Sequence, residues 1–376
     1  MHQKVTFNKS SNSNFNKTTN LSTFSLARIN NRIMRSILLL SFIFLLAGCS
    51  EPKIEVVRAF YFWENDAGIL STGNKEALDS LQIEKLYIKV FEVDRIDGKC
   101  EPYAKSILDL RLPKSSSVQE LIPCVYIQNK VFIESSREEL DELAENLAHL
   151  AKKYITVEIP GSTDKYIYDE LQIDCDWTEA SKGNYFYFLK KVKAESNKII
   201  SCTLRLYPYK FNDKMGVPPC DKAMLMCYNL LNPLKNDTKN TILDVDEMSK
   251  YLDTEIDYPI HIDVALPVYS WIQVYENKRF KGVIHNANRD LSSFMSPTEN
   301  LWYTMEKDTV VGGIYMRKGD RIKIEQVTKE QIDLAIDLIK KSGVLKDKAV
   351  VSFFSLESNE LNYYGYETLD HFYSSF

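Results

Sequence analysis

Eight short apolar segments recur along residues 56–356 and constrain the fold more than any other feature of the sequence. Their valine, isoleucine, phenylalanine and tyrosine content is typical of strands. The expected strands cover residues 56–63, 85–93, 123–128, 171–179, 199–207, 222–228, 260–271 and 349–356. Apolar strands that alternate with helices or long connections indicate parallel βα units. Eight such units favour a closed (β/α)8 TIM-type barrel over an open, doubly wound sheet. No glycine-rich phosphate loop follows the first segment, which further disfavours a dinucleotide-binding sheet.

Helical periodicity fills several of the connections. Helices are expected at residues 74–81, 136–154, 184–194, 246–252 and 329–342. Ser136 suits an N-cap for the second of these, and Gly343 is expected to close the last. A long segment of mixed pattern, from about residue 275 to 327, interrupts the alternation. It predicts an insertion after the seventh strand.

The first 49 residues have the character of a targeting segment. Residues 1–33 are rich in Asn, Ser, Thr and Lys. We interpret them either as disordered or as the result of a start codon assigned too far upstream, with translation beginning at Met34. After Met34 come a basic residue, an apolar run too short for a membrane span, and small residues, as in a secretory signal. Residues 46–49, Leu-Ala-Gly-Cys, resemble the bacterial lipobox, which implies cleavage before Cys49 and lipidation of its thiol. An ordinary signal peptide or a membrane anchor that happens to end in cysteine is the alternative.

The lipobox interpretation predicts where in the cell the protein is located. Residues 34–49 would be the lipoprotein signal peptide, and residues 50–376 a single barrel domain. We expect a cell-envelope protein that is lipid-anchored through Cys49 to a bacterial membrane, either periplasmic or surface-exposed. The oligomeric state stays open.

Charge and cysteine spacing exclude some functions. The net charge is −5 at pH 7, and acidic and basic residues are interspersed, so no nucleic-acid partner is expected. The cysteines after Cys49 show no CxxC or Cys/His spacing, and we predict neither a metal site nor a cofactor. Cys175 and Cys202 lie inside apolar strands and are interpreted as core residues. An oxidising compartment permits disulfides, but the spacing leaves any pairing open.

The fourth expected strand, residues 171–179, carries two carboxylates on one face. Successive side chains of a strand point to opposite faces, so Asp174 and Asp176 share the face opposite the apolar residues. Two carboxylates at this spacing are costly inside a protein unless they are paired or do chemistry. Lys89 and Arg205 are charges within other apolar strands, and they could neutralise the aspartates in a buried network. A structural and a chemical role both stay open.

Acids and aromatic rings also gather where the other strands end. The functional site of such a barrel lies at the C-terminal ends of its strands. The further candidates are Trp63, Glu179, Tyr207, Tyr228, Asn229, Tyr269, Trp271 and Glu357. Rings that stack on sugar faces, beside carboxylates acting as acid, base or electrostatic partner, suit glycoside chemistry. The same rings could instead be core residues, and His261 and His285 are expected to be structural.

Four short motifs, in order, resemble the chitinase-like glycoside hydrolase family 18. Residues 174–178, Asp-Cys-Asp-Trp-Thr, resemble its fourth-strand Asp-x-Asp-x-Glu, and residues 184–189 are similar to the Tyr-x-x-Phe-Leu helix that follows. Residues 226–229, Met-Cys-Tyr-Asn, resemble its sixth-strand Met-x-Tyr-Asp. Residues 265–269, Ala-Leu-Pro-Val-Tyr, resemble its seventh-strand Leu-Pro-x-Tyr-Gly, and residues 353–357 lie where the family has a last-strand aromatic residue. The resemblance implies a barrel and a glycan ligand.

The resemblance fails at the residue that matters most for catalysis. The family's general acid falls at Thr178, and a hydroxyl cannot protonate a leaving oxygen as a carboxylic acid can. Asn229 stands where the family has Asp. Glu179 is adjacent to Thr178, but a step of one residue turns a strand side chain to the opposite face. Glu179 could return to the site only if the chain has already turned out of the strand.

A second resemblance concerns the whole mature chain. Its CDWTE, MLMCYN and DVALPVYSW segments resemble an uncharacterised family of barrel lipoproteins seen mainly in the Bacteroidota, which implies an address and a fold but no activity. Two hypotheses follow. One is a glycoside hydrolase in which Asp174 and Asp176 are electrostatic or base partners and Glu179 or Glu357 is the acid. The other is a catalytically inactive glycan- or peptide-binding or scaffold lipoprotein.

Overall fold

The computed structural model describes residues 54–376, apart from residues 64–69, 105–111, 113–115, 155–156, 159–164, 167, 236, 253–255, 286–290 and 292. Residues 54–376 form one compact unit. The expected leader, residues 1–33 and 34–49 with the lipidation candidate Cys49, lies outside the described residues.

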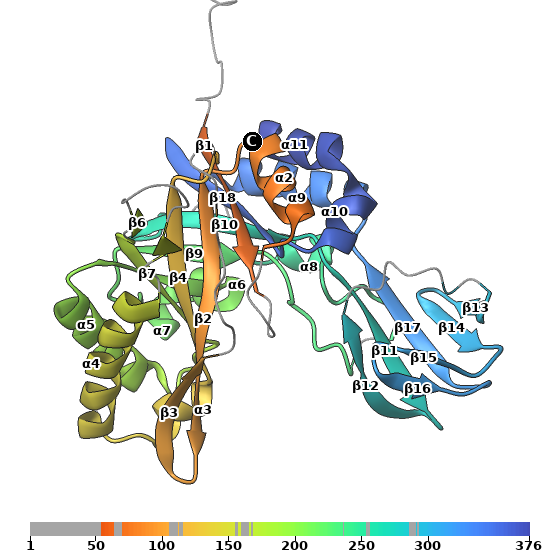
Figure 1. The fold of residues 1–376 in the computed structure, drawn as a ribbon, viewed down its shortest axis with the longest axis horizontal. Coiled ribbons are helices and arrows are strands. Elements are labelled where there is room, and N and C mark those ends of the chain that lie inside the picture. Colours follow the sequence, from red (N-terminus) through yellow and green to blue (C-terminus); the bar gives the residue numbers. More distant parts are fainter. Residues whose placement is uncertain are drawn as a thin grey trace, which may run out of the picture. The chain divides into compact units, whose positions relative to one another are not determined.

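Within the described part of the chain, eight parallel strands close into a barrel (Figure 1). They are β1 (Glu55–Phe62), β2 (Lys85–Ile96), β4 (Glu120–Ile127), β7 (Glu170–Asp174), β8 (Ile199–Arg205), β9 (Lys222–Met226), β10 (His261–Pro267) and β18 (Lys348–Phe354). Each pairs with the next, and β1 pairs with both β2 and β18, which closes the ring. The predicted (β/α)8 barrel is confirmed.

The expected helices are present, with shifted ends. They are α2 (Thr72–Ser80), α4 (Arg137–Tyr154), α5 (Lys182–Ser196), α8 (Val245–Ser249) and α9 (Lys329–Ser342). Ser136 caps α4, because its hydroxyl accepts from the Glu139 amide at 3.2 Å while the Glu139 carboxylate accepts from the Ser136 amide at 2.8 Å. Gly343 ends α9 with φ of 64°, the left-handed conformation that glycine adopts without strain.

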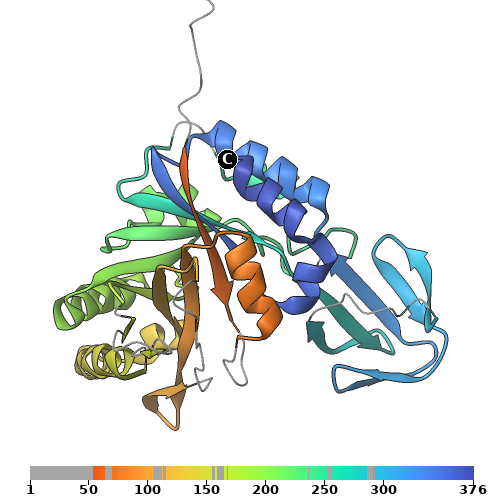
Figure 2. The same cartoon turned by 45° about the horizontal axis from the view of Figure 1, so that its top comes forward.

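Further helices occupy connections that the sequence left unassigned. They are α3 (Asn129–Glu134), α6 (Leu206–Lys210), α7 (Asn212–Met215), α10 (Ser358–Tyr364) and α11 (Tyr366–Ser374). In Figure 2, α9 and α11 lie side by side. None of the helices in the described residues combines the length and apolarity that a membrane crossing requires.

The expected insertion after the seventh barrel strand is present. Its sequence pattern is mixed, but it folds into an antiparallel sheet. Its order is β12-β11-β17-β14-β13, from β11 (Ser270–Glu276), β12 (Arg279–His285), β13 (Met295–Glu299), β14 (Trp302–Met305) and β17 (Arg321–Gln326). The hairpin of β15 (Thr309–Val311) and β16 (Ile314–Met316) belongs to the same segment. A separate apolar cluster that includes Ile272, Ile284 and Ile322 stabilises this sheet. In the barrel, β3 (Lys99–Ala104) adds an antiparallel partner to β2. A two-stranded ladder joins β5 (Val157–Glu158) to β6 (Lys165–Tyr166).

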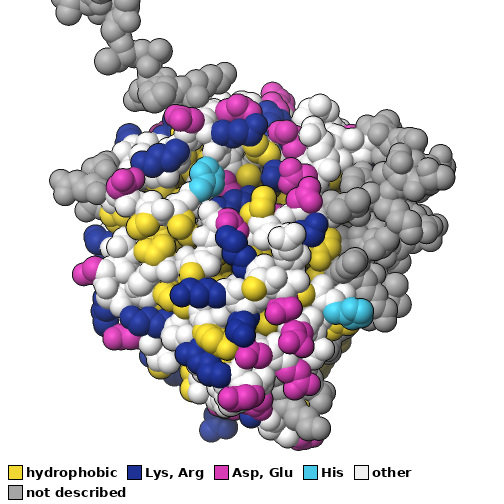
Figure 3. Space-filling model, turned by 90° about the vertical axis from the view of Figure 1, so that its left-hand side faces the viewer, with side chains coloured by type: hydrophobic (Ala, Val, Ile, Leu, Met, Phe, Trp, Pro, Cys, Tyr) yellow, Lys and Arg dark blue, Asp and Glu magenta, His cyan; other side chains and the backbone are white. Residues whose placement is uncertain are grey.

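Charges of both signs cover the outer surface. On the face drawn in Figure 3, basic, acidic and apolar side chains are interspersed, without a field of one sign. This matches the interspersed charges of the sequence.

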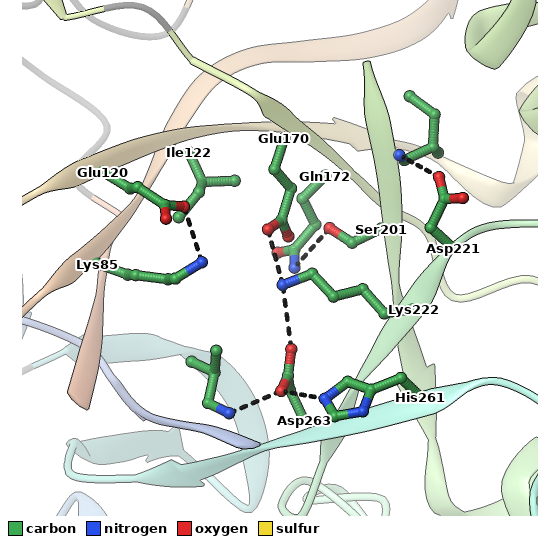
Figure 4. A network of polar contacts seen from close by, with 12 residues as sticks. Lys85, Glu120, Ile122, Glu170, Gln172, Ser201, Asp221, Lys222, His261 and Asp263 are labelled. Carbon is green, nitrogen blue, oxygen red and sulfur yellow. Dashed lines mark hydrogen bonds and ion pairs between the residues drawn. The ribbon is translucent and has the colours of Figure 1, made fainter. Parts of the chain in front are cut away.

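An ionic network fills the N-terminal end of the barrel (Figure 4). Lys222 lies between two buried carboxylates, at 2.7 Å from Glu170 and 3.2 Å from Asp263. Asp263 also accepts from the Val350 amide at 2.7 Å and lies 3.1 Å from His261. Burial opposes the charge of Lys222, but Asp263 and Glu170 raise the pKa of its ammonium above the ordinary value. His261 therefore contacts a structural network at the end of the barrel remote from the strand C-termini.

The network predicts a large loss of stability in Lys222→Met. Removing the ammonium leaves Glu170 and Asp263, whose side chains are 3% and 2% exposed, without their shared cation. We expect the free energy of unfolding in urea to fall by about 3–5 kcal/mol. The matched control is Lys85→Met, because Lys85 pairs with Glu120, a side chain that is 49% exposed, and it should cost at most about 1 kcal/mol. Equal losses in the two variants would contradict this account.

Candidate functional site

Asp174 lies at the C-terminal end of β7 and faces the barrel lumen. Its carboxylate accepts a hydrogen bond of 2.6 Å from the hydroxyl of Thr203 on β8. The pKa of Asp174 is raised from 3.8 to about 7, mainly by burial; nearby Asp176 contributes to the rise, while Thr203, Arg205 and Lys89 oppose it. Near neutral pH, Asp174 is therefore about half protonated and can both donate and accept hydrogen bonds.

Asp176 lies beyond the end of β7, at the rim. Its side chain is 62% exposed, and its carboxylate accepts from the Arg205 guanidinium at 3.1 Å. Another nitrogen of Arg205 donates to the carbonyl of Asn229. Lys89 is buried, and its ammonium lies 5.3 Å from the centre of the Trp63 ring. Arg205 therefore pairs with one of the two aspartates, Asp176, and this ion pair lies at the solvent-exposed rim and not in the buried network that was expected.

Five aromatic rings pack against one another at the C-terminal end of the barrel. Phe354 lies 5.8 Å from Trp63, 5.6 Å from Tyr228 and 5.7 Å from Tyr269, measured between ring centres. Tyr269 in turn lies 5.8 Å from Trp271. We call this set the aromatic mouth: Trp63, Tyr228, Tyr269, Trp271 and Phe354. Four of its members were candidates from the sequence, and they do come together.

Phe354 is the member that sequence reasoning missed. The strand alternation of β18 points Phe353 into the outer core, where it packs on Phe60 and Tyr373, and turns Phe354 to the lumen. The resemblance places the last-strand aromatic residue within residues 353–357, but it does not decide between Phe353 and Phe354. Ser352 and Val350 have the lumen parity of Phe354, so the two-residue period could have selected it.

The insertion fixes Trp271 through a buried ion pair. Glu325 on β17 accepts from the Trp271 indole and from the Thr241 hydroxyl, the latter at 2.7 Å. Its other oxygen lies 2.5 Å from the ammonium of Lys323, and both side chains are fully buried. Lys323 donates to the carbonyl of Lys239 at 2.9 Å. These contacts join the inserted sheet to the segment after β9 and hold one edge of the aromatic mouth. Sequence reasoning missed these contacts, because the segment shows only a mixed pattern.

Asn229 connects the aromatic mouth to the rim. Its side-chain oxygen accepts from the Tyr269 hydroxyl at 2.6 Å, and its carbonyl accepts from Arg205. Its φ of 54° is left-handed, which asparagine tolerates better than most residues. Asn229 therefore orients Tyr269 and Arg205 through its hydrogen bonds.

The two candidate acids are held elsewhere by polar partners. Glu179 forms an exposed ion pair with Lys214 at 3.0 Å. Glu357 accepts from the Ser355 hydroxyl at 2.8 Å and directly precedes α10. The Thr178 hydroxyl, at the position of the family acid, lies 3.3 Å from that of Ser181.

A cavity of about 390 Å³ lies beside the end of β7, and we call it the rim pocket. Asp176 and Glu179 both line it, so the chain has turned out of the strand after Asp174 and the two carboxylates share one pocket. Tyr207 lines it too, but the expectation that Tyr207 ends a strand is wrong. The strand stops at Arg205, Tyr207 lies on α6, and its exposed ring packs on Phe211.

Among the residues that the structure describes, no group of three His, Cys, Asp or Glu side chains is placed to hold a metal ion. The functional groups of the site are rings, hydroxyls and carboxylates, which suit hydrogen bonding and stacking on a polyhydroxylated ligand.

Comparison with known proteins supports the fold. No family model matches the chain, and no curated protein matches it. The class V chitinase from Nicotiana tobaccum is similar in structure, with a TM-score of 0.51 and 11% identity over 86% of this chain and 100% of that one. A mutant of that chitinase in complex with NAG4 gives a TM-score of 0.52 at 11% identity, covering 86% and 100%. The spore cortex-lytic enzyme of Bacillus cereus gives 0.49 at 12% identity, covering 86% and 75%. At this identity the likeness to the chitinase shows a distantly shared barrel fold alone.

The raised pKa of Asp174 predicts a pH-dependent stability. Between the unfolded value near 4 and the folded value of about 7, the folded chain binds more protons at this group than the unfolded chain. The contribution of Asp174 to stability therefore falls as pH rises through this window and is constant above it. We expect the free energy of unfolding of Asp174→Asn, minus that of the wild type, to be larger at pH 8 than at pH 5. A difference that does not change with pH would refute the assignment.

Proposed function

We propose that this chain is a cell-envelope lipoprotein whose barrel binds a glycan at the aromatic mouth. The observation that carries the proposal is the cluster of five rings at the C-terminal end of the barrel, where burial also raises the pKa of the Asp174 carboxyl group. Aromatic rings stack on the apolar faces of sugars, and a carboxyl group with neighbouring tyrosine hydroxyls can bond several sugar hydroxyls. The barrel fold shared with a chitinase supports the same class of ligand.

The polar groups at the rim favour binding over hydrolysis. Glycoside hydrolysis needs a carboxylic acid that protonates the leaving oxygen and a second group that acts on the anomeric carbon or its water. Thr178 occupies the position of the family acid. Asp176 and Glu179 are already engaged in ion pairs with Arg205 and Lys214.

Hydrolysis is the second candidate, and one observation favours it. Asp176 and Glu179 line the same pocket of about 390 Å³. A glycosidic bond in this pocket would lie beside the carboxylates of both Asp176 and Glu179. In this alternative Glu179 must leave Lys214 and take up a proton before it can act as the acid.

One experiment separates the two functions. Residues 50–376, which include all eight barrel strands, are tested against a glycan panel that includes N-acetylglucosamine oligomers, for both affinity and product formation. We expect binding without turnover. Phe354→Ala should weaken binding about tenfold, because Phe354 contacts three other rings of the aromatic mouth. The control is Tyr366→Ala, which removes a ring that is 39% exposed at the start of α11.

Each other outcome has a defined meaning. Equal losses in Phe354→Ala and Tyr366→Ala would place the ligand outside the aromatic mouth. Turnover that disappears in Asp176→Ala and Glu179→Gln would replace the binding proposal with the hydrolase. Turnover that survives Asp176→Ala would exclude the rim pocket as the place of reaction.

The lipobox supports the proposed location in the cell envelope, with Cys49 carrying the lipid. Wild-type protein produced in a bacterial host should incorporate labelled palmitate and sediment with membranes. Cys49→Ser should lose the label and leave the membrane fraction, because the lipobox then has no thiol to be acylated. Equal labelling of both proteins would exclude Cys49 as the lipidation site.

A further inference from the structure

Two buried cysteines lie in contact beneath the wall of the rim pocket. The sulfur atoms of Cys202 and Cys220 are 3.4 Å apart, and the residues are 0% and 8% exposed. Cys202 lies in the middle of β8, and Cys220 precedes β9. The neighbours Ser201 and Thr203 bond to lumen side chains of β7, so Cys202 points away from the lumen.

Backbone pairing holds the two cysteines in this position. The Asp221 amide donates to the Ile200 carbonyl at 2.8 Å, and the Ile200 amide donates to the Asp221 carboxylate at 2.8 Å. In the same register Cys202 lies opposite Ala223 on β9. The sulfur contact therefore lies between two pairings that hold the strands in register: Ile200 with Asp221, and Cys202 with Ala223. An S–S bond is about 2.0 Å long, so a modest side-chain movement would close the remaining distance.

We propose that Cys202 and Cys220 form a disulfide when the chain folds in an oxidising compartment. The bond would close a loop of residues 203–219, which contains α6 and α7. This loop supplies Arg205, Tyr207 and Lys214 to the rim pocket. The disulfide thus ties together the two ends of the segment that forms one wall of that pocket.

The chemistry is a two-step exchange with a disulfide oxidant such as oxidised glutathione. The Cys220 thiolate, on the slightly more accessible residue, attacks one glutathione sulfur and releases one reduced glutathione. The Cys202 thiolate then attacks the Cys220 sulfur and releases the second. Two protein thiols are oxidised, and one oxidised glutathione becomes two reduced molecules. Contact with Cys220 and burial raise the pKa of the Cys202 thiol, so exchange is slow in the folded state and occurs while the chain folds.

The pair differs from the other cysteines. Among the cysteines whose side chains the structure describes, sulfur-to-sulfur contact is made by Cys202 and Cys220. Cys227 is equally buried, and its thiol lies against the Leu225 carbonyl at 3.7 Å. Cys227 is therefore a matched control.

Peptide mapping tests the proposal directly. The full chain is unfolded with reductant, refolded in a glutathione redox buffer, alkylated and digested with trypsin without reduction. Trypsin separates residues 199–205 from residues 215–222, and each peptide carries one cysteine. We expect these two peptides to be recovered as one linked species, in Cys227→Ser as in the wild type, and to be absent in linked form from Cys220→Ser. Hydrogen exchange in residues 206–215 should be slower in the oxidised wild type than in the same protein after reduction.

Two results would overturn the inference. One is recovery of both peptides fully alkylated from the refolded wild type. The other is a linkage of Cys202 or Cys220 to a different cysteine. Neither result depends on glycan binding, so failure here is distinct from failure of the proposed function.

Discussion

Closure of the barrel forces alternate side chains of eight strands into one lumen, and the rest of the structure follows from how that lumen is filled. At one end Lys222 neutralises two buried carboxylates. In the middle of the lumen lies the apolar ring of Tyr61, and its one polar atom, the hydroxyl, donates a hydrogen bond to Gln172 at 2.7 Å. At the other end Asp174 has a neutral hydroxyl as its partner. His261 and Lys222 lower the pKa of Asp263 at the N-terminal end of the barrel, whereas burial raises the pKa of Asp174 at the other end.

This difference in environment supports the proposal that the C-terminal end of the barrel binds the ligand. A carboxyl group with a raised pKa can both donate and accept hydrogen bonds from a ligand, whereas a paired carboxylate is already satisfied. The insertion completes the site through Glu325, whose burial with Lys323 fixes Trp271.

The sequence predicted the barrel because strand and helix periods are local signals. It also placed Asp174 in the lumen, since alternation alone decides that. It failed for Tyr207, although Pro208 suits the first turn of a helix and could have ended the strand earlier. Lys323 and Glu325 could not be found, because their burial depends on how the inserted sheet packs on a distant segment. The contact of Cys202 with Cys220 likewise depends on the register between β8 and the turn before β9, which cysteine spacing does not encode.

The most direct measurement of the central claim is a crystal structure of the barrel with the tightest-binding oligosaccharide from the glycan panel. The account predicts an intact sugar with one ring face against Phe354 and a hydroxyl within hydrogen-bonding distance of Asp174. A sugar bound at the insertion, for example between Tyr275 and Trp302, with an empty aromatic mouth would contradict it. Cleaved product in the rim pocket would contradict it equally.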